Sequence, residues 1–183
     1  MIPTTVPPGI EVRPYRLGDA AALFEVVDGD REHLRRYLHW VDATESATDA
    51  ARFVRFAVET AEAGKAIHCG LFDGEAQIGG VGAGLIPVDR TADIGYWITS
   101  RWQGRGIVTA AVSELLEELF EVRDIHRVSI RAATENHRSQ AVPQRLGFTH
   151  EGRQRDAGWI RDRVHDYEVY ALLAHEWRAA RDA

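Results

Sequence analysis

The alternation of apolar and polar residues along the chain predicts short strands interspersed with amphipathic helices. Strands are indicated where apolar residues recur at every second position, and helices where they recur every three to four positions. The predicted strands span residues 10–14, 66–72, 77–85, 94–98, 128–132 and 167–172. The predicted helices span residues 19–27, 31–38, 48–62, 108–119 and 139–146. The helix over 108–119 has the clearest pattern, because a face of glutamates opposes its apolar stripe.

The order of these elements predicts a mixed α/β fold. Asp73 and Gly74 suit a tight turn between two strands, so the first half of the sheet is expected to be antiparallel. The strand at 94–98, the helix at 108–119 and the strand at 128–132 form a β-α-β unit, which joins parallel strands. No internal repeat or linker interrupts the sequence. We therefore expect a single domain over residues 1–183, with residues 1–9 as a flexible N-terminal extension.

Composition and charge argue against several classes of protein. With 45% hydrophobic and 27% charged residues, the chain is typical of a globular protein. It contains no apolar run near the roughly 20 residues of a membrane span, and its start does not read as a secretion signal, so a cytoplasmic location is expected. A formal net charge of −6 argues against a nucleic-acid partner. The single cysteine, Cys69, cannot form a cysteine-based metal cluster, and we expect no metal.

A glycine-rich motif lies between the strand at 94–98 and the helix at 108–119. It reads Arg-Trp-Gln-Gly-Arg-Gly-Ile-Val-Thr over residues 101–109. Gly104 and Gly106 allow the backbone to turn its amides toward an anion, and the helix start adds unpaired N–H groups. The motif is neither a Walker A loop nor a complete dinucleotide fingerprint. Taken alone, it predicts either a pyrophosphate-binding loop or a plain tight turn.

A second motif follows the strand at 128–132. It reads Asn-His-Arg-Ser-Gln-Ala-Val-Pro-Gln-Arg-Leu-Gly-Phe over residues 136–148. Asn136 suits the N-cap of a short helix, and Gly147 suits its end. Ser139 lies one turn beyond that cap, close to where two strand ends and the glycine motif should converge.

Together the two motifs resemble those of the GNAT superfamily of N-acetyltransferases. More narrowly, the chain is similar to the RimJ/RimL-type branch, which includes ribosomal-protein N-terminal acetyltransferases. Segments 34–40, 93–98 and 167–177 support the likeness, which extends from about Ile10 to Trp177. The resemblance implies a mixed, largely antiparallel sheet, splayed at the CoA site, with helices on both faces.

The resemblance also implies that acetyl-CoA is the acyl donor. The loop amides and two arginines would hold its pyrophosphate, and Ile98 and Thr99 would pair with the pantetheine arm, with the Ile98 amide polarising the thioester carbonyl. The residues expected to bind acetyl-CoA are Ile98, Thr99, Arg101, Gln103, Gly104, Arg105, Gly106, Ile107, Val108, Thr109, Asn136 and Ser139.

Asn136 and Ser139 are the expected catalytic residues. Many relatives use a tyrosine as the acid, but Pro143 stands at that position here, and Ser139 is the nearest hydroxyl in the motif. Ser139 would donate a proton to the leaving CoA thiolate, and Asn136 would contact the pantetheine arm. We expect direct transfer without an acyl-enzyme, because Cys69 lies outside both motifs.

The general base is left open by the sequence. Some relatives use a glutamate where Gly158 stands here, which leaves Asp156, Glu151, Asp93 or a relayed water.

The acceptor pocket is expected in the loops at 34–44 and 156–165, where His39 and Trp40 would form a wall, and His68 is a further candidate. The branch resemblance implies a protein N-terminus as the acceptor, and an α-amine with a pKa near 8 also loses its proton more readily than a lysine.

Three alternatives for the function remain at this point, and the oligomeric state is open as well. The acceptor could be a small amine such as an antibiotic, and the donor could be another acyl-CoA such as succinyl-CoA. A CoA-binding regulatory module without turnover is an alternative of another class. Relatives often form dimers, so a homodimer is an open alternative to a monomer.

Overall fold

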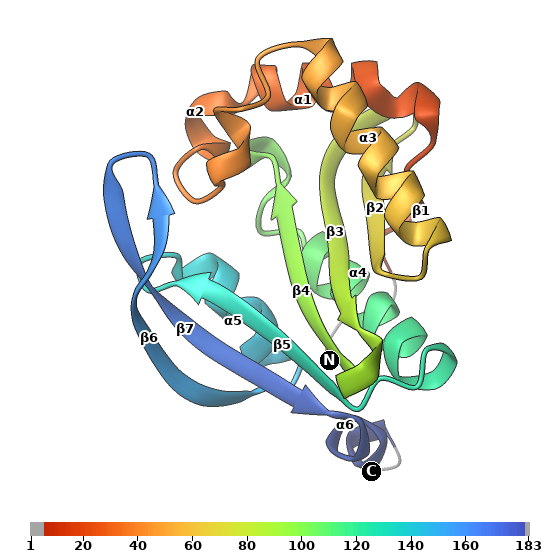
Figure 1. Ribbon diagram of the computed structural model, residues 1–183, viewed down its shortest axis with the longest axis vertical. Coiled ribbons are helices and arrows are strands. Elements are labelled where there is room, and N and C mark those ends of the chain that lie inside the picture. Colours follow the sequence, from red (N-terminus) through yellow and green to blue (C-terminus); the bar gives the residue numbers. More distant parts are fainter. Residues whose placement is uncertain (1–5, 182–183) are drawn as a thin grey trace.

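The computed structural model describes residues 6–181, which form a seven-stranded sheet with helices packed against it (Figure 1). The strands are β1 (Ile10–Pro14), β2 (Ala66–Asp73), β3 (Ala76–Ile86), β4 (Thr91–Ile98), β5 (Arg127–Ala133), β6 (Thr149–Ile160) and β7 (Arg163–Leu173). The helices are α1 (Ala20–Gly29), α2 (Arg31–Leu34), α3 (Ala47–Glu62), α4 (Ile107–Glu117), α5 (His137–Arg145) and α6 (Ala174–Arg181). A 3-10 turn covers His39–Val41 and a π-helical turn covers Glu118–Val122.

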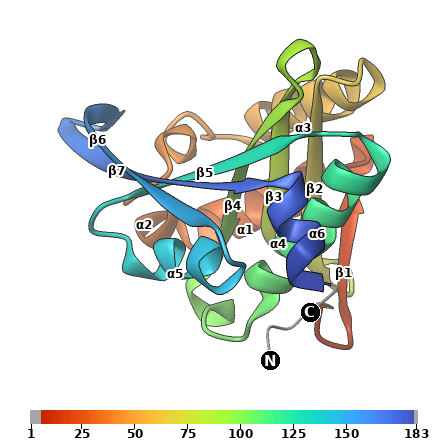
Figure 2. The same cartoon turned by 90° about the horizontal axis from the view of Figure 1, so that it is seen from below.

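The sheet is mixed and largely antiparallel, as the sequence predicts. Its strands follow the order β1-β2-β3-β4-β5-β7-β6, and only the pairing of β4 with β5 is parallel. That parallel pair is the predicted β-α-β unit, with α4 as the crossover. Figure 2 shows the twist of the sheet, because β5 and β7 run at a steep angle to β2 and β3.

Helices cover both faces of the sheet and build two apolar cores. On one face α3 packs on β2 and α1 packs on β3. On the other face α4 packs on β3 and β4, and α5 packs on β5 and β7. The first core contains Val27, Val41 and Val54, and the second contains Val112, Leu116 and Phe120. On their face of the sheet, α1 and α3 thus lie over β2 and β3, whereas β5 and β7 lie toward the other edge of the sheet.

The predicted helix over 31–38 is too long. In the structure α2 ends at Leu34, and the chain turns before a 3-10 turn at His39–Val41. This turn lets Val41 become fully buried and brings the ring of Trp40 to 5.6 Å from that of Trp97. Burial of these side chains outweighs continuation of a short, charged helix.

The segment expected to be a loop at 156–165 is instead a hairpin of β6 and β7. It reaches beyond the end of β5, toward α2 (Figures 1 and 2). The sequence does not reveal β6, because most of its side chains are exposed and carry no alternating apolar pattern. Strand pairing holds β6 in place, together with Arg153, which bonds to the buried Glu168 of β7. Helix α6 was also not predicted.

The N-terminal extension expected over residues 1–9 falls partly outside the described residues, which begin at Val6. The amide of Val6 lies 3.3 Å from the carboxylate of Glu114 in α4, and its side chain packs against the core. Within residues 6–181, no helix is long and apolar enough to cross a bilayer.

Gly79 allows β3 to lie close to the end of β4. A Cβ atom at this position would come within 2.6 Å of the carbonyl oxygen of Trp97. We expect Gly79→Ala to lower the free energy of unfolding by about 1–3 kcal/mol, because extra atoms at a packed site force the backbone to move. Gly84→Ala is the matched control on the same strand, since a Cβ there meets nothing within 4 Å. Urea denaturation of both variants checks this, and equal stabilities would contradict it.

Candidate acetyl transfer site

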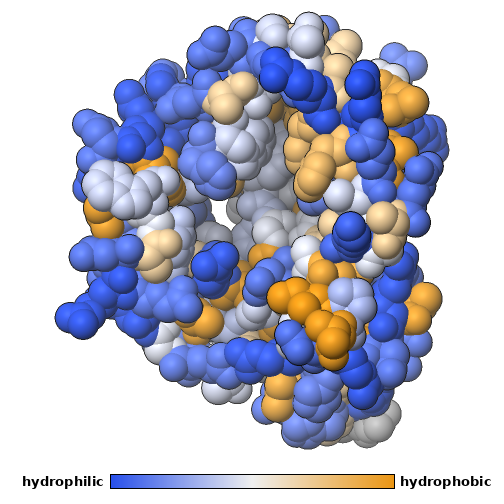
Figure 3. Space-filling model, in the orientation of Figure 1, coloured by the Kyte–Doolittle hydropathy of each residue, from blue (hydrophilic) through white to orange (hydrophobic). Residues whose placement is uncertain are grey.

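The sheet divides where β4 runs past β5. Their parallel pairing joins Thr91–Ile94 to Arg127–Ile130, and the strands then diverge (Figure 1). On its other side β4 stays paired with β3, and the Thr99 amide donates to the Ile78 carbonyl at 3.0 Å. Alternate residues of an antiparallel strand face the same partner, so the Ile98 amide faces away from β3, toward the gap. Figure 3 shows a deep hollow in the molecular surface at this place.

The backbone amide and carbonyl of Thr99 are both already hydrogen-bonded within the protein, whereas the amide of Ile98 faces the gap. The Thr99 amide is bonded to Ile78, and the Thr99 carbonyl accepts from the Trp102 amide at 3.0 Å. Of the two residues expected to pair with the pantetheine arm, Ile98 is therefore the one whose amide faces the gap.

The glycine motif forms the turn that leads into α4. Gly104 and Gly106 have φ angles of 74° and 76°, in the left-handed region that glycine adopts without strain. Gly106 is the N-cap of α4 and provides no side-chain cap. Ile107, Val108 and Thr109 occupy the first helical positions, whose amides lack partners within a helix. The turn thus gathers backbone donors at the positive end of the helix dipole, as an anion site requires.

The two arginines of the motif are placed differently. The Arg105 guanidinium lies over the Trp102 ring, 4.4 Å from its centroid, and donates to the Arg101 carbonyl at 3.3 Å. The Arg101 side chain is exposed. Stacking therefore fixes Arg105 beside the loop, whereas Arg101 extends into solvent.

The Gln103 side chain links the loop to two helices. It lies 2.9 Å from the Nε2 atom of His33 in α2, and it accepts a hydrogen bond from Arg138 in α5. A second link runs from Asp30, whose carboxylate accepts from the Ser100 amide at 2.5 Å and from its hydroxyl at 2.9 Å. Sequence reasoning missed these partners, because each contact joins positions far apart in the chain.

The second motif behaves as predicted at its start. Asn136 is the N-cap of α5, and its side-chain oxygen accepts from the Ser139 amide at 3.2 Å. Ser139 is half-buried, and its carbonyl accepts from the Tyr96 hydroxyl of β4 at 2.7 Å. Its own hydroxyl lies 3.3 Å from the same Tyr96 oxygen. Ser139 and the end of β4 are therefore brought together at the gap, as the sequence predicts.

Tyr96 is a residue of this site that sequence reasoning missed. It lies two positions before Ile98, so both residues share one face of β4. Burial raises the pKa of the Tyr96 phenol above its ordinary value, which keeps the hydroxyl protonated. The sequence feature that could have identified Tyr96 as a site residue is its position on the predicted strand that carries Ile98.

Two carboxylates considered as the base are engaged elsewhere. Glu151 bonds to Arg127, whose hydrogen bonds hold the pKa of that carboxyl below its ordinary value. Asp93 accepts from the Ser129 hydroxyl, in the part of β4 and β5 that is still paired. Both therefore lie by the closed end of the strands rather than by the gap. Asp156 lies on β6, where its amide donates to the Asp166 side chain at 2.9 Å.

Trp40 and His68, two candidates for the wall of the acceptor pocket, lie in different parts of the structure. Trp40 packs against Trp97 of β4, on the face covered by α1 and α3. His68 lies instead under α3, with its ring 5.7 Å from that of Phe53 and 5.8 Å from that of Phe56. Burial lowers the pKa of His68, which favours the neutral imidazole. Its aromatic contacts are with α3, away from the β4–β5 gap.

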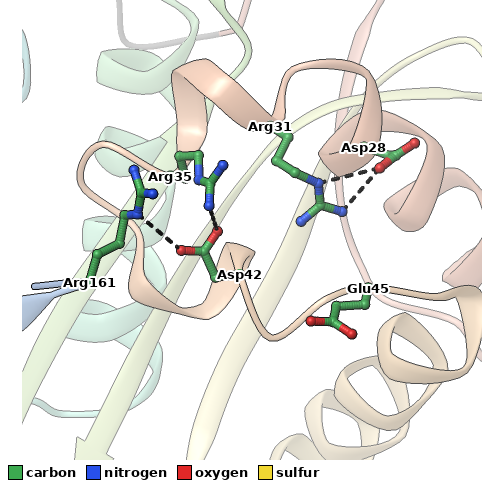
Figure 4. Close-up of a pocket in the computed structure, with 6 residues that line it drawn as sticks. All are labelled: Asp28, Arg31, Arg35, Asp42, Glu45 and Arg161. Carbon is green, nitrogen blue, oxygen red and sulfur yellow. Dashed lines mark hydrogen bonds and ion pairs between the residues drawn. The ribbon is translucent and has the colours of Figure 1, made fainter.

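Two adjoining hollows lie between α2 and the turn of the β6–β7 hairpin, with volumes of about 610 and 350 Å³. Arg35 and Arg161 line both of them. Asp42 joins these arginines, at 2.8 Å from Arg35 and 3.7 Å from Arg161 (Figure 4). The segments expected to form the acceptor pocket, 34–44 and 156–165, thus do face each other, although the second is a hairpin.

Among residues 6–181, no group of three or more histidine, cysteine, aspartate or glutamate side chains is placed to hold an ion.

Comparison with known proteins identifies the family. A model of the acetyltransferase (GNAT) domain matches residues 10–149. YdaF of Bacillus subtilis (strain 168) is 43% identical over 97 residues, which are 53% of this chain and 53% of YdaF. The ribosomal-protein-serine acetyltransferase of Escherichia coli (strain K12) is 28% identical over 152 residues, 82% of this chain and 85% of that protein.

Solved structures agree with this assignment. RimL, a ribosomal L7/L12 alpha-N-protein acetyltransferase in complex with coenzyme A, has a TM-score of 0.88 and 25% sequence identity. The match covers 94% of this chain and 98% of RimL. Because the family model matches most of the sequence, the chain belongs to the GNAT acetyltransferase family. The likeness to the RimJ/RimL-type branch is confirmed by these relatives, although the chain spans about half the length of YdaF, at 53%.

Proposed function

We propose that this protein transfers the acetyl group of acetyl-CoA directly to the N-terminal α-amine of a polypeptide. The observation that supports this best is the convergence at the β4–β5 gap. There the start of α4, the gap-facing amide of Ile98 and the Asn136–Ser139 turn are linked by the hydrogen bonds of Gln103 with Arg138 and of Tyr96 with Ser139. A phosphate site, a carbonyl-polarising amide and a hydroxyl donor are what acetyl transfer from a thioester requires.

The donor would lie along the opened edge of β4. Its pyrophosphate is held by the amides of Ile107 to Thr109, with Arg101, Gln103 and Arg105 around the loop. The pantetheine arm lies along the end of β4 toward Asn136, and the thioester carbonyl faces the Ile98 amide. Ser139 lies at the sulfur. The coenzyme A bound to RimL supports this choice of ligand, since this chain has the same fold.

The acceptor is proposed to be an α-amine for two reasons. The curated relatives include a ribosomal-protein-serine acetyltransferase, and RimL is described as an α-N-protein acetyltransferase. The hollows between α2 and the hairpin turn are also large enough to admit the first residues of a peptide. We further infer that residues 1–183 act as a single acetyltransferase domain in the cytoplasm.

Acetylation of synthetic peptides tests this function. We expect peptides with a free α-amine to be acetylated at that nitrogen, as mapped by mass spectrometry. The same peptides with a blocked N-terminus and an internal lysine should react much more slowly, because a lysine amine with a pKa near 10.4 is mostly charged at neutral pH. Activity confined to antibiotics or polyamines would contradict a polypeptide acceptor. Binding of acetyl-CoA without thiol release in the presence of any amine would favour a regulatory module instead.

A further inference from the structure

His165 is a buried histidine on β7, in the hairpin that β7 forms with β6. It pairs with Gly158 across β6 and β7, and only 5% of its surface is exposed. The hydroxyl of Tyr170, farther along β7, contacts Gln144 of α5 at 3.2 Å, so Tyr170 points to the α5 side. Successive residues of a strand alternate in direction, so His165 points to the opposite side, toward α2.

Glu135 is the acidic partner of His165. The imidazole Nδ1 lies 3.4 Å from a carboxylate oxygen of Glu135, without hydrogen-bond geometry, and is otherwise buried without a partner. Glu135 directly precedes Asn136, the N-cap of α5. The carbonyl of Asp166, the next residue on β7, accepts from the Thr134 amide at 3.0 Å and from its hydroxyl at 2.9 Å. The imidazole is therefore fixed beside the residues that lead into the Asn136–Ser139 turn.

The His165 ring lines the smaller hollow, whose volume is about 350 Å³. The other ionisable groups of that hollow come from two further elements. From α2 and the turn after it come Glu32, Arg35, Arg36 and Tyr37, and from the hairpin turn come Arg161, Asp162 and Arg163. A buried polar atom without a hydrogen bond costs free energy, and such groups in native structures often have a chemical role. Here the group is an imidazole that opens onto the proposed acceptor pocket.

We propose that His165 receives the proton of the acceptor ammonium and that Glu135 stabilises the imidazolium that results. This inference rests on the proposed function, because it names the base of that same reaction. With Nδ1 directed to Glu135, Nε2 is the nitrogen that meets the ammonium, directly or through one water.

The step balances as follows. The ammonium gives one proton to His165, and the neutral nitrogen attacks the thioester carbonyl carbon. The C–N bond forms and the C–S bond breaks. Ser139 gives its hydroxyl proton to the departing thiolate and takes back the second proton lost by the nitrogen. The imidazolium then releases its proton to water, so the products are the amide, free CoA thiol and one proton.

The test is the pH dependence of kcat/KM with an α-amine peptide. If His165 takes a proton from the ammonium, the protonated amine can serve as the substrate. The wild type should then be active at pH 7, where most of the α-amine is protonated. His165→Gln should leave only the neutral amine, about one-tenth of an α-amine with a pKa near 8. We therefore expect a loss of about tenfold at pH 7 that largely disappears at pH 9. His150→Gln is the matched control, because His150 also lies on the hairpin beside a carboxylate, 2.7 Å from Glu168, but on the α5 side.

A second variant covers the case in which His165→Gln fails to fold. Glu135 is about half exposed, so Glu135→Gln should fold, and it should lower kcat/KM at pH 7 more than at pH 9 because the imidazolium loses its carboxylate partner. An inactive wild type would contradict the proposed function itself. An active wild type whose pH profile is unchanged in both the His165 and Glu135 variants would overturn the role of His165 alone.

Discussion

Replacing Gly106 by valine should weaken acetyl-CoA binding by tenfold or more, which corresponds to about 1.4 kcal/mol. Gly106 has a φ angle of 76°, and a β-branched residue in this region is a strained outlier. It is also the N-cap of α4, so relief of the strain would turn the first amides of the helix away from the phosphates. A valine side chain would in addition stand where the pyrophosphate approaches.

Calorimetric titration of the variant with acetyl-CoA measures this effect. Gly64→Val is the matched control, because Gly64 has a φ angle of 66° just after α3 and lies outside the proposed site. It should lose stability through the same backbone strain and keep its affinity for acetyl-CoA. Unchanged affinity in a folded Gly106→Val protein would remove the glycine loop from the donor site.

The parts of the fold that the sequence predicts are those in which each element carries its own signal. Helix α4 has one apolar stripe, which packs against β3 and β4, and Asp73-Gly74 marks the β2–β3 turn. These patterns are local, because the buried face repeats with the period of the element itself. Strand β6 has no such signal, since its side chains are mostly exposed and it depends on pairing with β7.

The residues of the candidate site fall into the same two groups, those that a local sequence pattern predicts and those that depend on contacts across the fold. The glycine loop and the Asn136 cap were predicted, because their backbone requirements are set by residues close together in sequence. Tyr96 beside Ser139, and Gln103 between α2 and α5, depend on contacts across the fold. The pairing of Glu135 with His165 depends on how β7 lies against the end of β5. No spacing in the sequence contains that register, so the sequence alone could not single out this pair of residues.

Tyr96 changes how the leaving-group acid must be tested. Sequence reasoning found no competing hydroxyl in the second motif, but β4 brings the Tyr96 phenol to 3.3 Å from the Ser139 hydroxyl. The phenol already donates to the Ser139 carbonyl at 2.7 Å. Its raised pKa makes it a weaker acid than an ordinary tyrosine. The geometry therefore assigns Tyr96 to holding Ser139 in place. The Ser139 hydroxyl donates to the Tyr96 oxygen, and it must turn from that oxygen to serve the sulfur of the proposed donor.

Ser139→Ala should lower kcat by about 10- to 1,000-fold and change acetyl-CoA affinity little. The loss is partial because a thiolate whose conjugate acid has a pKa near 8.5 is already a tolerable leaving group. Affinity should persist because the proposed pyrophosphate site is at the start of α4, away from Ser139. Ser129→Ala is the control, since Ser129 lies on β5 and its hydroxyl bonds to Asp93 in the paired part of the strands.

The measurements are kcat and the Kd for acetyl-CoA, with Tyr96→Phe beside Ser139→Ala. Tyr96→Phe removes the hydrogen bond to the Ser139 carbonyl but not the serine hydroxyl, so its loss of kcat should be smaller. A Ser139→Ala enzyme that works at full speed would exclude Ser139 as the proton donor. Equal losses in binding and in rate would make Ser139 a positioning residue. A greater loss in Tyr96→Phe than in Ser139→Ala would transfer the role of proton donor to the tyrosine.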